Sequence, residues 1–235
     1  MSERRPIYLL AGGRGGGDMT AILRLVFRDI GVPSPTIAYV GSASDDNPAF
    51  FERISGMVKG AGKGKFVLAP TCDGKADIKK TVKTIESADA VFVSGGDVEA
   101  GMQVLERRGI AGIFAELYRQ GKFFFGVSAG SIMLAEKWVR WRDPDEDSTA
   151  ELFTCLGVAP VICDTHGEGE GWEELRAAVS LRPEGTLGYG ITSNTCLRVQ
   201  ADGRVEALAG PVARYVRRGN EVLKQPDLKP APGNA

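Results

Sequence analysis

The sequence predicts an α/β fold, a three-layer α/β/α sandwich whose central sheet is mostly parallel and carries antiparallel strands toward the C-terminus. Short runs of β-branched and aromatic residues alternate with segments in which apolar residues recur at helical spacing. Repeated strand-then-helix order is typical of a parallel sheet covered by helices on both faces. Beyond residue 188 the strand-like runs follow one another without helices between them, which indicates antiparallel pairing.

The individual elements follow from these patterns. The predicted buried strands are residues 7–10, 36–40, 65–69, 90–94, 123–127 and 158–163. The predicted helices are residues 19–30, 48–60, 78–86, 99–107, 110–120, 131–138 and 172–180. The late strand-like runs are residues 188–199, 204–208 and 213–217, with Asp202-Gly203 as a hairpin turn.

The charge balance argues against a nucleic-acid partner. The 235 residues include 29 basic and 30 acidic side chains, whereas binding to a phosphate backbone draws on a surplus of positive charge. No stretch approaches the roughly 20 apolar residues that span a bilayer, and the apolar run at 7–11 is too short for the core of a signal peptide. We therefore expect a cytoplasmic protein that has no membrane partner.

A single domain is expected over residues 1–224, because no Pro/Ser-rich or highly charged stretch interrupts the periodic apolar segments there. Residues 225–235 are rich in proline and have no large apolar side chain after Leu228. Such a composition cannot bury enough apolar surface to offset the entropy lost on ordering, so a disordered tail is expected.

The cysteines and the histidine argue against disulfides and against a metal site. The four cysteines are scattered without a C-x-x-C pair, and a chain of this size can bury a core without cross-links. Only one histidine is present, so a His-rich or Cys/His cage cannot be built at the usual ligand spacings. We expect no metal, and we interpret the cysteines as buried, small apolar side chains.

A candidate nucleophile stands where a bulky predicted strand runs directly into a predicted helix. In Gly126-Val127-Ser128-Ala129-Gly130, the small residues around Ser128 would let the backbone turn sharply and expose its hydroxyl. The start of a helix also presents free N–H groups, of which that of Ala129 is the natural donor to an oxyanion. Packing alone is the alternative explanation for small residues at such a turn.

The sole histidine is the candidate base. Serine needs an adjacent base to act as a nucleophile, and imidazole serves most often because its pKa lies near neutral pH. His166 follows the predicted strand 158–163 in a glycine-rich loop. That loop would lie at the carboxyl edge of the sheet, where Ser128 is also expected. A solvated loop histidine without a catalytic role is the alternative.

Two glycine-rich turns also follow predicted strands. Gly95 and Gly96, in the segment 93–97, would let a backbone N–H approach a substrate closely, although a plain tight turn explains them equally well. The turn at 11–18 suggests a phosphate cradle, but the G-x-G-x-x-G spacing fails at Asp18 and Thr20 and no Walker A lysine is present. We interpret this second turn as a border of the pocket around the serine.

Three of these segments together resemble one family, the dipeptidase E and cyanophycinase group of serine peptidases, which has a glutamine-amidotransferase-like α/β/α fold. The resemblance covers most of the chain and rests on Ser-Gly-Gly-Asp at 94–97, Gly-Val-Ser-Ala-Gly at 126–130 and Asp-Thr-His at 164–166. His166 follows Ser128 by 38 residues (166 minus 128), an interval similar to that of the family and shorter than in α/β-hydrolases. Relatives in the family suggest a monomer or a homodimer.

The resemblance implies a role for each residue of the site. Ser128 would be the nucleophile and His166 the base, and the N–H groups of Gly96 and Ala129 would hold the oxyanion, with Gly95 beside them. The expected function is that of a serine hydrolase that cleaves a peptide or amide bond in a small peptide-like substrate through an acyl-enzyme, without a cofactor. Two alternatives are an inactive binding or scaffold protein on the same fold and an amidase of a small amide.

The acid of the triad has two candidates. The dipeptidases of the family place an aspartate 15 residues after the serine, which falls on Asp143 (143 minus 128). Glu168 competes with it, because residues two apart in an extended segment project to the same side. His-x-Glu is also how related amidotransferases orient their histidine. We favour Asp143.

Two departures from the family pattern bear on specificity. Residues 190–196 read Gly-Ile-Thr-Ser-Asn-Thr-Cys, with Ser193 near the place of an acidic residue in relatives, so we do not transfer the family's aspartyl-dipeptide specificity. Residues 167–174 are glycine-rich and acidic. The acidic loop leads to the hypothesis that the leaving side of the substrate carries a positive group. A solvated loop before a helix whose first turn favours acidic residues is the alternative.

Overall fold

The central layer of the protein is a seven-stranded sheet. The computed structural model describes residues 4–13 and 19–231, and the sheet has the strand order β11-β10-β1-β5-β4-β2-β3. Five strands are parallel, namely β1 (Ile7–Leu10), β5 (Phe123–Val127), β4 (Ala90–Val93), β2 (Thr36–Val40) and β3 (Lys65–Leu68). β10 (Cys196–Val199) and β11 (Val205–Leu208) extend the sheet beyond β1 as antiparallel strands.

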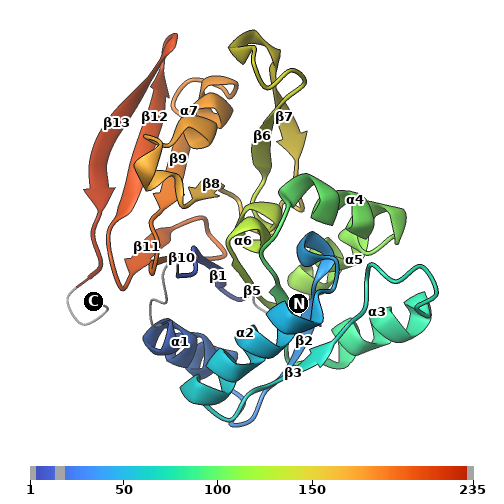
Figure 1. Cartoon of the computed structure of the whole chain (residues 1–235). Coiled ribbons are helices and arrows are strands. Elements are labelled where there is room, and N and C mark those ends of the chain that lie inside the picture. The colour runs from blue at the N-terminus through green and yellow to red at the C-terminus, as the bar shows by residue number, and fades with distance from the viewer. Residues whose placement is uncertain (1–3, 14–18, 232–235) are drawn as a thin grey trace.

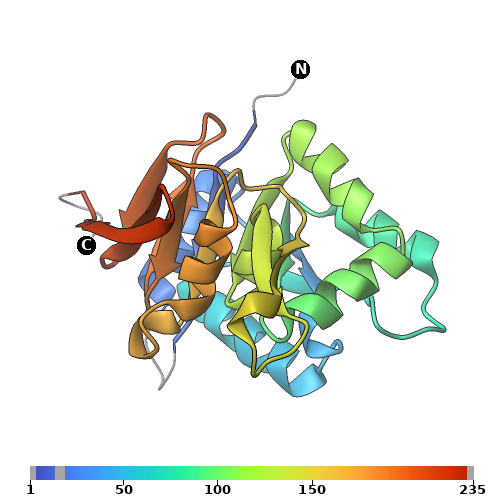
Figure 2. The same cartoon turned by 90° about the horizontal axis from the view of Figure 1, so that it is seen from above.

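Helices cover both faces of this sheet (Figures 1 and 2). α1 (Thr20–Ile30) and α2 (Pro48–Ala61) pack on one face. The opposite face is covered by α3 (Ile78–Ser87), α4 (Val98–Arg107), α5 (Ala111–Arg119) and α6 (Ala129–Leu134). The predicted three-layer α/β/α fold is therefore confirmed. None of the described helices combines the length and the apolar character needed to cross a bilayer.

β5 shows why the central strands read as continuous apolar runs in the sequence. Phe123 and Phe125 belong to the core beneath α1 and α2, whereas Phe124 belongs to the core on the opposite face. All three side chains are at most 1% exposed. Successive residues of a strand point to opposite faces, so a strand covered by helices on both sides is apolar at every position.

A smaller sheet and a hairpin complete the structure. The smaller sheet has the order β13-β12-β9-β8, built from β8 (Ile162–Thr165), β9 (Leu187–Ile191), β12 (Val212–Arg218) and β13 (Glu221–Leu228). β8 and β9 are parallel and the other pairs are antiparallel, and α7 (Glu173–Ser180) packs against this sheet. The hairpin of β6 (Lys137–Trp141) and β7 (Ala150–Thr154) projects from the molecule (Figure 1).

Two predicted elements are wrong because tertiary pairing determines them. The helix predicted at 131–138 ends at Leu134, and the residues that follow pair with β7 to form β6. The strand predicted at 158–163 begins only at Ile162 and pairs with β9 in the smaller sheet. Local apolar spacing does not show which partner strand is available, so both errors are of the same kind.

The late strands also divide differently from the prediction. The run 188–199 is two strands, β9 and β10, which belong to different sheets. The turn at Asp202-Gly203 lies between β10 and β11, as predicted. The disorder predicted from Gln225 is wrong for residues 225–228, which complete β13 against β12. Residues 232–235 of that predicted tail lie outside the described residues.

The start of α6 lies so close to the end of β4 that Gly130 has no room for a side chain. A Cβ at Gly130 would lie 2.1 Å from the carbonyl oxygen of Val93. We expect Gly130→Ala to lower the free energy of unfolding by about 2–3 kcal/mol, because α6 must move away from β4.

The matched control is Gly112→Ala on α5, where an added Cβ meets nothing within 4 Å. This variant should be neutral or more stable by up to ~1 kcal/mol, since alanine favours a helix more than glycine does. Urea unfolding of both variants measures the difference. Equal stability of the two variants would contradict the close approach.

Candidate active site

Ser128 occupies a strained turn between β5 and α6. Its backbone has φ 53° and ψ -125°, a conformation that is rare for residues other than glycine. The carbonyl oxygen of Leu10, at the end of β1, accepts the N–H of Ser128 at 2.8 Å and the hydroxyl of Ser131 at 2.8 Å. The neighbouring strand therefore holds both ends of the turn, which has the geometry of a nucleophile elbow.

The Gly95-Gly96 turn faces Ser128 from the end of β4. A Cβ on Gly95 would lie 3.1 Å from Ser128 Cβ and 3.8 Å from its Oγ. Gly96 has φ +142°, and a Cβ there would lie 1.7 Å from the carbonyl oxygen of Ala43. The N–H of Asp97 donates to the same carbonyl at 2.8 Å. Only glycine fits this turn, which brings bare backbone next to the serine.

Ala129 is the first residue of α6. The first N–H groups of a helix have no partner within the helix, so they are available to an oxyanion. Ala129 and Gly96 line the same cavity as Ser128. The structure thus brings together Gly95, Gly96, Ser128 and Ala129.

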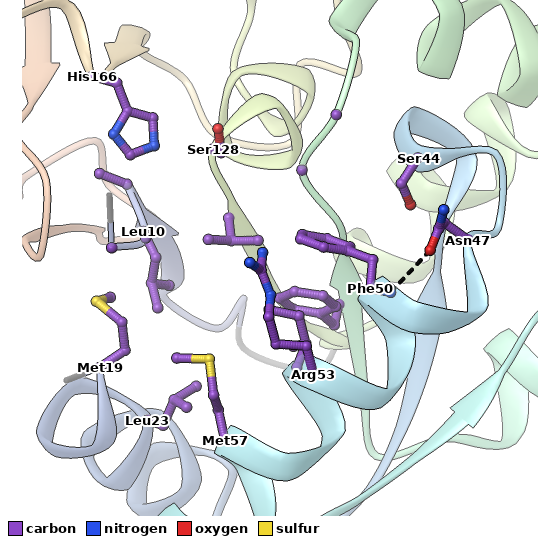
Figure 3. Close-up of a pocket in the computed structure, with 18 of the residues that line it drawn as sticks. Leu10, Met19, Leu23, Ser44, Asn47, Phe50, Arg53, Met57, Ser128 and His166 are labelled. Carbon is purple, nitrogen blue, oxygen red and sulfur yellow. Dashed lines mark hydrogen bonds between the residues drawn. The ribbon is translucent and has the colours of Figure 1, made fainter. Parts of the chain in front are cut away.

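His166 lies beside the cavities that Ser128 lines. It follows β8 directly, and both residues line the same two cavities, one of which is shown in Figure 3. Its backbone is left-handed with φ 65°, and its N–H donates to the carbonyl of Ile191 at 3.4 Å. The Nδ1 atom lies 3.1 Å from the hydroxyl oxygen of Ser193. The contact on the imidazole thus comes from Ser193, which lies just after the end of β9.

Ser193 connects His166 to Glu168. The hydroxyl of Ser193 donates to Glu168 Oε1 at 2.7 Å, and its N–H donates to the same oxygen at 3.1 Å. Since that hydroxyl donates to the carboxylate, it accepts from Nδ1–H of His166, which assigns the base to Nε2. Partial burial acts to raise the pKa of Glu168, but the hydrogen bonds from Ser193, the backbone N–H of Glu168 and the nearby His166 together hold that pKa below its usual value.

Asp143, the favoured candidate for the triad acid, lies away from His166. It is exposed in the connection between β6 and β7, where its carboxylate accepts the N–H of Asp145 at 3.1 Å and its own N–H donates to Thr149 Oγ1 at 3.0 Å. It lines neither cavity at Ser128. The spacing fails because the chain after α6 runs outward along the hairpin.

Glu168, the competing candidate, is the carboxylate that the structure connects to His166. It lies in the 3-10 turn Gly167–Gly169 and contacts Ser193. The extended geometry that suggested Glu168 is therefore absent, although the residue itself reaches the histidine side of the site. In the sequence, Ser193 stands out only as a departure from the family pattern. Its position between His166 and Glu168 is not indicated by any local sequence pattern.

The larger cavity at Ser128 has a volume of about 850 Å³ and is mostly apolar. Figure 3 shows Arg53 and Met57 of α2 and Leu23 of α1 around it. The guanidinium of Arg53 lies 4.8 Å from the centre of the Phe50 ring. The glycine turn predicted to border the pocket does so at residues 12 and 13, and residues 14–18 lie outside the described residues.

A smaller cavity of about 280 Å³ also adjoins Ser128 and is rich in carboxylates. Its acidic lining residues are Asp97, Asp164, Glu170, Glu173 and Glu174. Asp164 is only 5% exposed, and burial followed by the negative charge of Glu174 raises the pKa of Asp164 to about 7. Asp164 belongs to the Asp-Thr-His motif at 164–166, but no local pattern in that motif indicates its burial.

Comparison with known proteins identifies the family. Residues 7–206 match the model of peptidase family S51. The chain belongs to peptidase family S51. The resemblance to the dipeptidase E and cyanophycinase group is thereby confirmed. A cyanophycinase from Synechococcus elongatus is 26% identical over 189 residues, which are 78% of this chain and 49% of that relative.

Other relatives share smaller parts of the chain. The pyridoxal 5'-phosphate synthase subunit PdxT of Geobacillus stearothermophilus is 25% identical over 138 residues, 59% of this chain and 65% of that protein. The chain thus spans about half to two thirds of the length of these curated relatives.

Solved structures share the fold of this member of family S51. A peptidase from an acI-B1 Actinobacterium has a TM-score of 0.67 at 14% identity, with 97% of each chain covered. A putative peptidase E protein from Listeria monocytogenes EGD-e has a TM-score of 0.55 at 14% identity, with 94% of this chain and 98% of that chain covered. At such identities the likeness shows the fold alone.

The raised pKa of Asp164 predicts that this carboxylate destabilises the fold near neutral pH. A carboxyl group whose pKa is about 7 in the folded protein, against an ordinary value of 3.8, carries no penalty below its unfolded pKa. The penalty grows as pH rises between the two values and is complete above the folded pKa. We expect Asp164→Asn to stabilise the protein by about 1–3 kcal/mol at pH 8 and by less at pH 5.

Denaturant unfolding at the two pH values measures this gain. Asp143→Asn, which changes an exposed carboxylate, is the control and should have little effect at either pH. A loss of stability in Asp164→Asn at pH 8 would contradict the prediction.

Proposed function

We propose that the protein is a serine peptidase that hydrolyses small peptides through an acyl-enzyme on Ser128. The observation that carries this proposal is the strained turn at Ser128, which opens on the same cavities as His166. A backbone conformation of this kind persists only where the surrounding structure enforces it, and such positions cluster at catalytic sites. Membership of peptidase family S51 supports the same conclusion.

In the proposed reaction, Nε2 of His166 takes the proton of the Ser128 hydroxyl while Oγ attacks the carbonyl carbon of the scissile bond. The N–H groups of Gly96 and Ala129 stabilise the negative charge on the former carbonyl oxygen. The C–N bond then breaks as His166 gives its proton to the leaving amine, which leaves an ester on Ser128. Water attacks this ester, His166 takes the water proton, and return of that proton to Oγ releases the acid.

Glu168 acts on this cycle through Ser193. The carboxylate holds the Ser193 hydroxyl, and that oxygen holds Nδ1–H of His166. This chain of hydrogen bonds keeps the proton on Nδ1 and leaves Nε2 unprotonated in the resting state. It also stabilises the imidazolium that forms during acylation. Glu168 and Ser193 are therefore positioning residues, since neither needs to touch the substrate.

The first test is labelling of the intact protein with a fluorophosphonate, followed by mass spectrometry of the peptide that contains Ser128. Labelling is expected at Ser128, because an activated serine attacks phosphorus as it attacks a carbonyl. Ser128→Ala should abolish it, and His166→Ala should slow it by a factor on the order of 100 or more. Ser180→Ala, at the exposed end of α7, is the control and should label normally. A folded protein that does not label would favour a binding protein.

The second test compares the three side chains that bear on the histidine. Glu168→Gln and Ser193→Ala are each expected to slow labelling of Ser128 by about 10- to 100-fold, whereas Asp143→Asn should leave the rate unchanged. Glu168→Gln should also move the acid limb of the rate profile to lower pH, because removal of a negative charge lowers the pKa of a nearby imidazole. Ser193→Thr should restore most of the rate, since it returns the hydroxyl.

If the labelling rate of Glu168→Gln fell at the same acidic pH as that of the parent protein, Glu168 would have only a structural role. A slow Asp143→Asn variant with normal Glu168→Gln would refute the assignment and return the acid to Asp143.

A further inference from the structure

The turn at residues 41–46, which follows β2 and is called the β2 turn below, supports the Gly95-Gly96 turn of the site. The carbonyl oxygen of Ala43 accepts the N–H of Asp97 at 2.8 Å, and a Cβ on Gly96 would lie 1.7 Å from that oxygen. The β2 turn therefore fixes the peptide group that follows Gly96. The N–H of Gly96 itself donates to no acceptor among the described residues, so it is available to an oxyanion.

Two serine hydroxyls fix the peptide group that precedes Gly96. Oγ of Ser44, in the β2 turn, lies 3.1 Å from Oγ of Ser94, and the Ser94 hydroxyl donates to the carbonyl oxygen of Gly95 at 3.2 Å. Ser94 is fully buried, so its hydroxyl depends on these protein contacts. In a trans peptide the C=O and the N–H point in opposite directions. The contact on the Gly95 carbonyl therefore directs the N–H of Gly96 away from the two serines.

Asp46 fixes the β2 turn to the segment that follows β3. Its Oδ2 accepts the N–H of Thr71 at 2.6 Å and that of Cys72 at 2.7 Å. Its Oδ1 accepts the hydroxyl of Thr71 at 3.2 Å, and its own N–H donates to the carbonyl of Gly41 at 3.0 Å. Hydrogen bonds to an ionised acceptor are stronger than those between neutral groups. The carboxylate of Asp46 is therefore a strong link between the two segments.

Two consecutive residues of the β2 turn have a left-handed backbone. Asp45 has φ 54° and Asp46 has φ 49°, and residues other than glycine adopt this region mostly as single residues. Such conformations persist only where the surrounding structure enforces them, and they are frequent at functional sites. The three hydrogen bonds that the Asp46 carboxylate accepts are interactions that enforce the conformation here.

We propose that Asp46 is a positioning residue for the oxyanion site. Its carboxylate holds the β2 turn in place, and Ala43 and Ser44 of that turn set the direction of the N–H of Gly96 from both sides. Asp46 lines neither cavity at Ser128, so it acts without touching the substrate. The inference rests on the proposed peptidase function, in which this N–H stabilises the charge that develops during attack by Ser128.

The rate of fluorophosphonate labelling at increasing reagent concentrations tests this role in the full chain. Asp46→Gly removes the carboxylate without adding backbone strain, because glycine adopts a positive φ freely. We expect the maximal labelling rate at Ser128 to fall by about 10- to 100-fold, somewhat less than on outright loss of an oxyanion donor. The reagent concentration that gives half of this rate should stay within about threefold of the parent value, because the donor acts mainly on the transition state.

Two further variants separate this role from a general loss of stability. Asp46→Asn keeps an oxygen for the two backbone N–H groups and tolerates a left-handed backbone, so it should label within about threefold of the parent rate. Asp77→Gly is the matched control. Oδ1 of Asp77 likewise accepts two backbone N–H groups, those of Lys79 at 2.9 Å and Lys80 at 3.4 Å, at the start of α3. This control should label at the parent rate.

Amide hydrogen exchange measures the support of the turn without any reaction. The N–H of Asp97, which donates to Ala43, should exchange about tenfold faster in Asp46→Gly than in the parent and at the parent rate in Asp77→Gly. A parent-like maximal labelling rate in Asp46→Gly would overturn the inference, as would slow labelling with unchanged exchange at Asp97. Faster exchange in a protein whose parent does not label would support the link from Asp46 to the turn and overturn the peptidase proposal.

Discussion

The site depends on one carbonyl group, that of Leu10 at the end of β1. It accepts both the N–H of Ser128 and the hydroxyl of Ser131, so the strained turn is fixed to a neighbouring strand instead of relying on its own sequence. The carbonyl of Val93 closes the turn from the other side, because Gly130 lies against it with no space for a Cβ. Three adjacent parallel strands, β1, β5 and β4, thus hold the serine, and their apolar faces are what the helices bury.

The histidine side of the site has a separate origin in the smaller sheet. β8 and β9 are parallel with Thr165 opposite Ile191, so the residues that follow them emerge at the same edge. His166 and Glu168 follow β8, and Ser193 follows β9. Their contacts are therefore a consequence of one strand pairing. The arrangement proposed for catalysis lies where the ends of two sheets meet, so its two halves come from different parts of the chain.

The parts of the site that the sequence predicted are those encoded locally. A bulky strand that runs into small residues around Ser128 is visible in one short segment, and so is a lone histidine after a strand. The contact of Ser193 with Glu168 depends on β8 and β9 pairing across 25 residues, for which a single sequence has no signal. The choice of Asp143 rested on a 15-residue spacing carried over from the family, and that spacing does not show that β6 and β7 pair as a hairpin.

The distribution of charged side chains in the two cavities could not be predicted from the composition of the chain. A formal net charge of -1 describes a balanced surface, yet carboxylates gather in one cavity at Ser128 while Arg53 lines the other. Folding alone does not favour this separation, because burial of Asp164 near Glu174 opposes ionisation of its carboxyl group. Carboxyl groups with strongly shifted pKa values are concentrated at functional sites, where proteins retain a cost in stability. The position of Asp164 in the same cavity as Ser128 therefore reflects the requirements of the site and not those of the fold.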